Sequence, residues 1–162
     1  MKSNSRTAFA KREKSIGRFL GISALFTLLG PPIGELVVSI CLGFLAATPQ
    51  LGARDWMEAI NAFLTVTFFG AIFGLPIAYF VGSLPATGVG LAVALWERHK
   101  GLISWRVTLS ATLVSWLFFA IRAGGLIETD DGTRVWQISL LLGHLAAAGV
   151  CWWSARRFLG RA

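Results

Sequence analysis

The chain has 162 residues, of which 55% are apolar and 14% are charged, and its mean hydropathy is +0.66. A soluble domain carries about 25% charged residues, so this composition excludes an ordinary soluble globular protein. The formal net charge is +7. Because the basic residues gather at the ends of apolar runs and in one terminal segment, the charge indicates membrane orientation and no nucleic-acid partner.

The first apolar run follows a basic segment, residues 1–18. The run itself, residues 19–47, is longer than the roughly 7–15 residues of a signal-peptide core, so we predict a retained first membrane span behind a cytoplasmic tail. Basic tails of this kind attract anionic phospholipid headgroups. The residues expected to contact them are Lys11, Arg12, Lys14 and Arg18.

Two prolines, Pro31 and Pro32, interrupt the first run. Proline lacks an amide donor and clashes with the preceding turn, so the sequence predicts a kink or break at this point. In lipid, the carbonyl groups that the prolines free must find partners inside the protein. Pro49 is expected to end the helix, and residues 51–58 are expected to form a short polar loop.

The second run, residues 59–96, is longer than one upright span needs. Pro76 and Pro85 predict a kinked or tilted helix, with a re-entrant segment over residues 82–90 as the alternative. Small residues recur at every fourth position, the spacing that lets two helix backbones approach closely in a membrane. This packing ridge comprises Gly70, Gly74, Ala78, Gly82, Ala86, Gly90 and Ala94.

Two shorter runs, residues 103–121 and 135–155, predict the third and fourth spans. Thr108, Thr112 and Ser115 share one face of the third span and should face a neighbouring helix. The fourth span has tryptophans at both ends, which is typical of the two membrane interfaces, and a second basic tail follows it at residues 156–162. A shorter ridge of small residues runs along this span through Ser139, Gly143 and Ala147.

The distribution of Lys and Arg predicts the orientation of the spans. With the N-terminus in the cytoplasm, 12 of the 15 basic residues lie on the cytoplasmic side and three, Arg54, Arg122 and Arg134, lie outside. Such an excess marks the cytoplasmic side of a membrane protein. The predicted fold class is therefore an all-α integral membrane protein, a four-transmembrane-helix bundle over residues 19–155. Both termini are cytoplasmic, and the first two helices are kinked at their prolines.

Glu35 is the one acidic residue well inside a predicted span, directly after the proline break. A carboxylate is costly inside a bilayer, and such residues commonly mark a proton or cation path. Pro76 produces a similar break in the second span, and paired helix breaks are typical of transporter sites. The sequence thus predicts a transport or proton site at Glu35, Pro31, Pro32 and Pro76. The alternative is a structural acid bonded to freed backbone groups or to hydroxyls.

His144 lies near the middle of the fourth span. An imidazole can bind the metal of a haem or a pigment, but the second histidine, His99, belongs to a basic loop. The alternative is a hydrogen-bonded packing histidine. No metal site and no other cofactor is predicted, and Cys41 and Cys151 are expected to be inert buried thiols. The chain has no zinc, Ser-His-Asp or phosphate-loop motif, so we predict that it is not an enzyme.

Two short stretches carry a resemblance. Residues 29–34 (LGPPIG) and 79–88 (YFVGSLPATG) resemble a pattern in small, uncharacterised polytopic proteins of proteobacterial inner membranes. The resemblance implies location in a bacterial inner membrane, and it brings neither an activity nor a functional residue with it.

The expected function is that of a non-enzymatic accessory or assembly subunit, which packs against itself as a homo-oligomer or against a larger membrane partner. The ridge of the second run favours this function, because it is longer than a four-helix bundle needs. One alternative is a small oligomeric transporter or channel with Glu35 near its path. The other is haem or pigment binding through His144.

Overall fold

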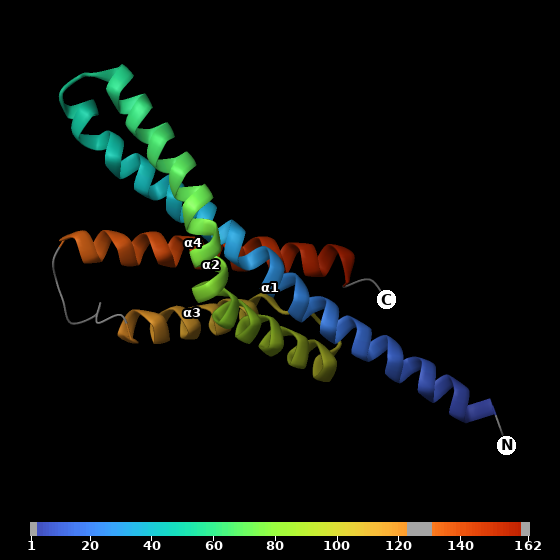
Figure 1. The fold of residues 1–162 in the computed structure, drawn as a ribbon. Coiled ribbons are helices and arrows are strands. Elements are labelled where there is room, and N and C mark those ends of the chain that lie inside the picture. Colours follow the sequence, from blue (N-terminus) through green and yellow to red (C-terminus); the bar gives the residue numbers. More distant parts are fainter. Residues whose placement is uncertain (1–2, 123–130, 160–162) are drawn as a thin grey trace.

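The structure, a computed structural model, describes residues 3–122 and 131–159, and every regular element within them is an α-helix. Figure 1 shows the helices α1 (Ser3–Gly52), α2 (Trp56–Lys100), α3 (Trp105–Arg122) and α4 (Asp131–Phe158). Three of them, α1, α2 and α4, are long and apolar enough to cross a membrane, whereas the apolar part of α3 is shorter at 17 residues. The prediction of an all-helical membrane protein is therefore confirmed. The fourth span, the proline kinks and the orientation stay predictions.

The turn between α1 and α2 comprises residues 53–55 and is shorter than the loop predicted over residues 51–58. α1 does not end at Pro49 as predicted but continues through it for another turn. α2 begins early because Oδ1 of Asp55 accepts a hydrogen bond of 3.1 Å from the backbone amide of Glu58. Such an N-cap satisfies an amide that the first helical turn leaves without an intrahelical acceptor. The result is a long helical hairpin with a tight tip.

α1 also begins earlier than the predicted first span. Its helical backbone starts at Ser3, so the basic N-terminal segment runs directly into the span. Arg18 belongs to this continuous helix and forms an ion pair with α2, in which its Nη2 lies 2.8 Å from Oε1 of the buried Glu97. The other residues predicted to contact lipid headgroups have side chains outside the described part of the structure; they are Lys11, Arg12 and Lys14.

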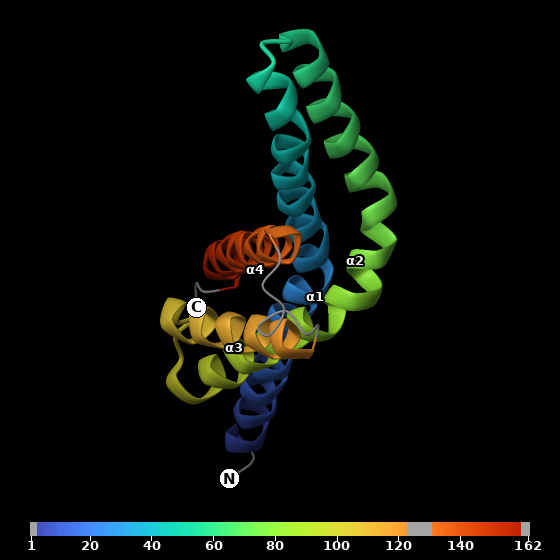
Figure 2. The ribbon, with the colours of Figure 1, turned by 90° about the vertical axis from the view of Figure 1, so that its left-hand side faces the viewer.

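Both long helices stay helical through their internal prolines. α1 contains Pro31 and Pro32, and α2 contains Pro76 and Pro85. Residues 82–90 belong to the continuous helix α2 and not to a re-entrant segment. Each proline leaves the carbonyl four residues earlier without its usual amide donor. Figure 2 shows α2 as a curved helix beside a straighter α1.

The four helices contact one another in a ring. Within the described residues, α1 packs against α2 and α4, and α3 packs against the same two helices, whereas α1 and α3 make no close backbone contact. α4 crosses α1 at a slant (Figure 1). On one side of this crossing all four helices lie together. On the other side the α1–α2 hairpin leans away from α3 and α4, as Figures 1 and 2 both show.

The buried core lies on the side of the crossing where α1 begins and α4 ends. Three helices supply its buried residues, which are Ile22, Phe26, Val89, Val93, Ala94, Cys151 and Ala155. α3 adds Thr108 and Thr112, which are buried and whose hydroxyls donate to carbonyls one turn earlier, at 3.1 and 2.8 Å. The polar face of the third predicted span therefore turns toward the bundle.

Candidate functional site

The small residues of α2 lie along α1. Gly70 lies against Ser39, Gly74 against Glu35, Gly82 against Pro31, Ala86 against Gly30, and Gly90 against Phe26. Residues without bulky side chains allow such close approach of two membrane helices. Of the two remaining positions, Ala94 is buried in the core and Ala78 is half-buried. Most of the ridge is thus occupied within the chain, which leaves little of it for a helix of another protein.

Glu35 lies on the face of α1 that contacts α2. Its side chain is half-buried, and its Oε1 accepts a hydrogen bond of 3.0 Å from the hydroxyl of Ser39. Ser39 is one turn further along α1 and is itself buried. On α2 the carboxylate faces Gly74, where a Cβ atom would overlap Oε1. The missing side chain at Gly74 therefore provides the space that the carboxylate occupies.

Tyr79 satisfies a backbone group that proline leaves free. Its hydroxyl donates a hydrogen bond of 2.8 Å to the carbonyl oxygen of Leu28. In a regular helix this carbonyl would accept from the amide of residue 32, but Pro32 has no amide hydrogen. A second bond between the helices, 2.9 Å long, joins the hydroxyls of Thr27 and Thr87. These bonds join α2 to the segment of α1 that precedes and includes its two prolines.

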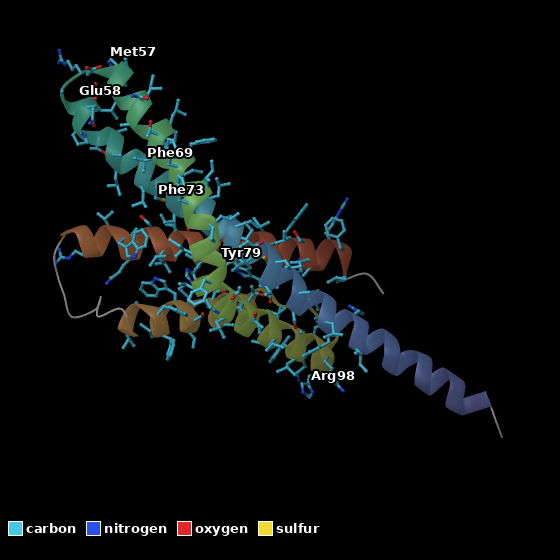
Figure 3. The ribbon with its side chains drawn as sticks, viewed as in Figure 1. Met57, Glu58, Phe69, Phe73, Tyr79 and Arg98 are labelled. Atoms are coloured by element: carbon cyan, nitrogen blue, oxygen red, sulfur yellow. The ribbon has the colours of Figure 1, made fainter. Side chains whose placement is uncertain are left out.

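The proline-containing segments of α1 and α2 lie beside each other. The contacts at Gly74 and Gly82 place the α1 segment 31–35 beside the α2 segment that contains Pro76. Figure 3 shows Tyr79 in this middle part of the hairpin, near the crossing with α4. Pro76 therefore lies on the part of α2 that runs along residues 31–35, and a transport or proton site at these residues stays a prediction.

α4 approaches this region from a third side. A Cβ atom on Gly143 would lie 2.9 Å from the carbonyl oxygen of Gly34 and 3.1 Å from Cγ2 of Val38, so the backbones of α1 and α4 meet at these glycines. Ser139 and Ala147, about one turn to either side of Gly143, are buried as well. Since Gly34 precedes Glu35, the carboxylate lies beside the crossing of α1 and α4.

His144 is half-buried, and its Nδ1 lies 2.8 Å from the carbonyl oxygen of Leu140 in the same helix. A carbonyl only accepts, so Nδ1 carries the proton and Nε2 is left as the nitrogen that could bind a metal. His99 is exposed in the last turn of α2. The α4 residues that share a cavity with the end of α2 are Trp152 and Arg156, about two and three helical turns from His144. The structure therefore does not bring the two histidines together. Haem or pigment binding stays a prediction, which a visible absorption spectrum of the purified protein tests.

Two residues of this region, Tyr79 and Ser39, are not among the predicted site residues. Tyr79 is the single tyrosine of the chain and stands three residues after Pro76. Ser39 stands four residues after Glu35, the spacing at which side chains of one helix face meet. The spacing of Ser39 is visible in the sequence. The contact of Tyr79 depends on the register of α2 against α1, which local spacing does not encode.

The thiols and the possible metal ligands of the described residues form no further cluster. Cys41 and Cys151 are free thiols, half-buried and buried respectively. Among the described residues no three His, Cys, Asp or Glu side chains lie together in a way that would hold a metal ion. Comparison of the chain with protein-family models, with curated proteins and with solved structures finds no match.

Proposed function

We propose that this chain is a non-enzymatic, four-span subunit of a bacterial inner membrane that associates with further membrane helices through its α1–α2 hairpin. Those helices come from a second copy or from a larger membrane partner. One observation carries the proposal: beyond the crossing at Gly34 and Gly143, the hairpin leans away from α3 and α4 (Figure 1). The most apolar stretch of α2 has no buried residue. The packing ridge does not support the proposal, because its glycines already contact α1.

The uncovered side of α2 is rich in large apolar residues, which we call the outer α2 face. It comprises Phe68, Phe69, Ile72, Phe73, Ile77, Phe80 and Leu84, all of them exposed. Figure 3 shows Phe69 and Phe73 on the side of α2 that is turned away from α1. Their rings stack with 6.1 Å between centroids. Aromatic rings in such an array supply the van der Waals contact that drives helix association in lipid, where burial from water contributes nothing.

The lengths of the apolar segments support a tilted hairpin. Residues 59–96 of α2 extend for about 57 Å as a straight helix, whereas a hydrocarbon core is about 30 Å thick. The apolar part of α3 extends for only about 26 Å. Tilting and bending shorten the extent of a long helix along the membrane normal, so that α2 and the shorter α3 can cross the same bilayer. The slant between α1 and α4 is consistent with four spans in one membrane.

Site-specific cross-linking in native membranes tests the proposal. A photoreactive amino acid replaces Phe80, which is 86% exposed on the outer α2 face, and the matched control replaces Phe118, which is 61% exposed on α3. We expect a discrete protein adduct from position 80, with the mass of two copies or of one copy plus one partner, and lipid adducts alone from position 118. Lipid adducts alone at both positions, together with a monomer mass in native lipid, would reject the proposal.

A proton or cation path at Glu35, in a small oligomeric transporter or channel, is the second candidate. The arrangement that favours it is a carboxylate with one hydrogen-bond partner among the described residues, Ser39, close to the place where α1 meets both α2 and α4. Glu35→Gln keeps an acceptor for Ser39 but removes the charge, so it should abolish proton- or cation-dependent flux into vesicles, while Glu35→Asp retains part of it. Equal flux in both variants would leave Glu35 with a structural role.

A further inference from the structure

A cavity of about 600 Å³ lies at the end of the molecule opposite the hairpin tip, and we call it the inner pocket. All four helices line it: α1 through Arg18, α2 through Trp96 and Lys100, α3 through Trp105, and α4 through Trp152 and Arg156. It adjoins the buried core, where all four helices of the described chain lie together. None of the sequence predictions singles out this convergence of three cations and three tryptophans.

The lining of the inner pocket carries uncompensated positive charge. Arg18 is paired with Glu97 at 2.8 Å. Among the described residues, neither Lys100 nor Arg156 has a carboxylate within ion-pair distance. Two positive charges in excess favour an anionic ligand.

The tryptophans hold one of these charges in place and make the pocket walls apolar. The ring of Trp152 packs edge-on against Trp105, with 5.3 Å between centroids. The guanidinium carbon of Arg156 lies 5.5 Å from the centroid of Trp152, within the range of a cation–π contact. A ligand that combines an anionic head with apolar chains matches this combination of charges and aromatic walls. Tryptophan side chains are also enriched at the level of lipid headgroups.

We infer that the inner pocket binds the phosphate of an anionic phospholipid from the cytoplasmic leaflet. The excess of basic residues assigns this end of the molecule to the cytoplasm. Basic pockets between membrane helices on that side bind anionic headgroups. Lys100 and Arg156 hold the phosphate, and the tryptophans contact the glycerol and the upper acyl chains. The lipid bridges α1 and α3, which have no close backbone contact of their own. This inference does not depend on the association of the α1–α2 hairpin.

Lipid retention by two charge-matched double variants tests the inference. The pocket variant is Lys100→Gln with Arg156→Gln. The control is Arg98→Gln with Arg157→Gln, which removes the same charge from exposed neighbours on the same two helices that do not line the pocket. Purified protein in detergent is titrated with phosphatidylglycerol, with phosphatidylcholine and with inorganic phosphate. Native mass spectrometry measures bound lipid, and the melting temperature reports stabilisation by the ligand.

We expect the unaltered protein to retain phosphatidylglycerol in preference to phosphatidylcholine and to melt at a higher temperature in its presence. The pocket variant should bind phosphatidylglycerol about 30-fold more weakly, from the loss of two charges near the membrane surface, and the control variant should bind as the unaltered protein does. Equal weakening in both variants would overturn the site, because diffuse surface charge would then explain binding. Equal stabilisation by inorganic phosphate would overturn the assignment to a lipid. Trp152→Phe, which keeps every charge, should retain the preference for phosphatidylglycerol.

Discussion

A proline inside a membrane helix leaves a carbonyl group without its intrahelical donor, and the hydrocarbon core holds no water to replace that donor. Leu28 is such a case, since the residue four positions later is Pro32. The hydroxyl of Tyr79 takes the place of the missing amide at 2.8 Å. A side chain from α2 thus satisfies one carbonyl group that a proline of α1 leaves free, and the proline-containing segment becomes part of the contact between the two helices.

Tyr79→Phe removes this hydrogen bond and should lower the free energy of unfolding by about 1 kcal/mol, measured by detergent-driven unfolding in mixed micelles. The matched background is Pro32→Ala, which returns an amide donor to the Leu28 carbonyl. In that background Tyr79→Phe should lower the free energy of unfolding by much less, because the Leu28 carbonyl already has a partner. Equal costs in the two backgrounds would show that the bond does not compensate for Pro32.

At the scale of elements, the contact between α1 and α2 is set by small residues with unequal surroundings. A Cβ atom on Gly90 would lie 2.9 Å from Cβ of Phe26 and 3.2 Å from the backbone of Ser23, whereas one on Gly88 would meet nothing within 4 Å. The two glycines stand in the same helix, half a turn apart. Replacing each glycine by alanine changes the intrinsic helix preference equally, so a difference in stability between the two variants reports packing alone.

Gly90→Ala should therefore destabilise the protein by about 1–3 kcal/mol, the usual cost of forcing a methyl group into a closely packed contact. Gly88→Ala should leave stability unchanged or raise it by up to about 1 kcal/mol, because alanine restricts the unfolded chain. Thermal unfolding in detergent compares the two variants with the unaltered protein. Similar destabilisation by both changes would contradict the close contact at Gly90.

At the scale of the whole molecule, the helices form one packed end and one open end. The core residues and the inner pocket lie at the packed end, where α1 begins and α4 ends. The open end carries the tight hairpin tip at residues 53–55 and the exposed outer α2 face (Figures 1 and 3). The distribution of basic residues predicts that the packed end faces the cytoplasm. The two proposed interactions, with a lipid and with partner helices, thus lie at opposite ends.

Accessibility of single cysteines measures this orientation. In a background with Cys41 and Cys151 replaced by alanine, Arg54→Cys at the hairpin tip should react with a membrane-impermeant maleimide in intact spheroplasts. Leu102→Cys, which is 70% exposed in the turn between α2 and α3, should react only after the membrane is permeabilised. The reverse pattern would invert the predicted topology, and reaction of both sites in intact cells would exclude an odd number of crossings between them.

Composition and periodicity are enough to predict the helical class, the apolar segments and the hydroxyl face of α3. These features depend on hydrophobicity and on residue spacing within one helix, and both are properties of the sequence itself. The sequence does not predict where α1 ends and α2 begins, because a single side chain, Asp55, caps α2 and shortens the turn.

Contacts between distant residues needed the tertiary structure. The sequence predicts the ridge of α2 but assigns it to a partner, whereas the register of the hairpin turns it toward α1 and leaves Gly74 as the space for Glu35. The same register brings Tyr79 to Leu28. The inner pocket forms only where four helices meet, and its lining residues lie between positions 18 and 156 of the sequence. The crossing and the register of the helices decide these three contacts. Crossing and register arise from the summed packing of whole helices and not from any local pattern of residues.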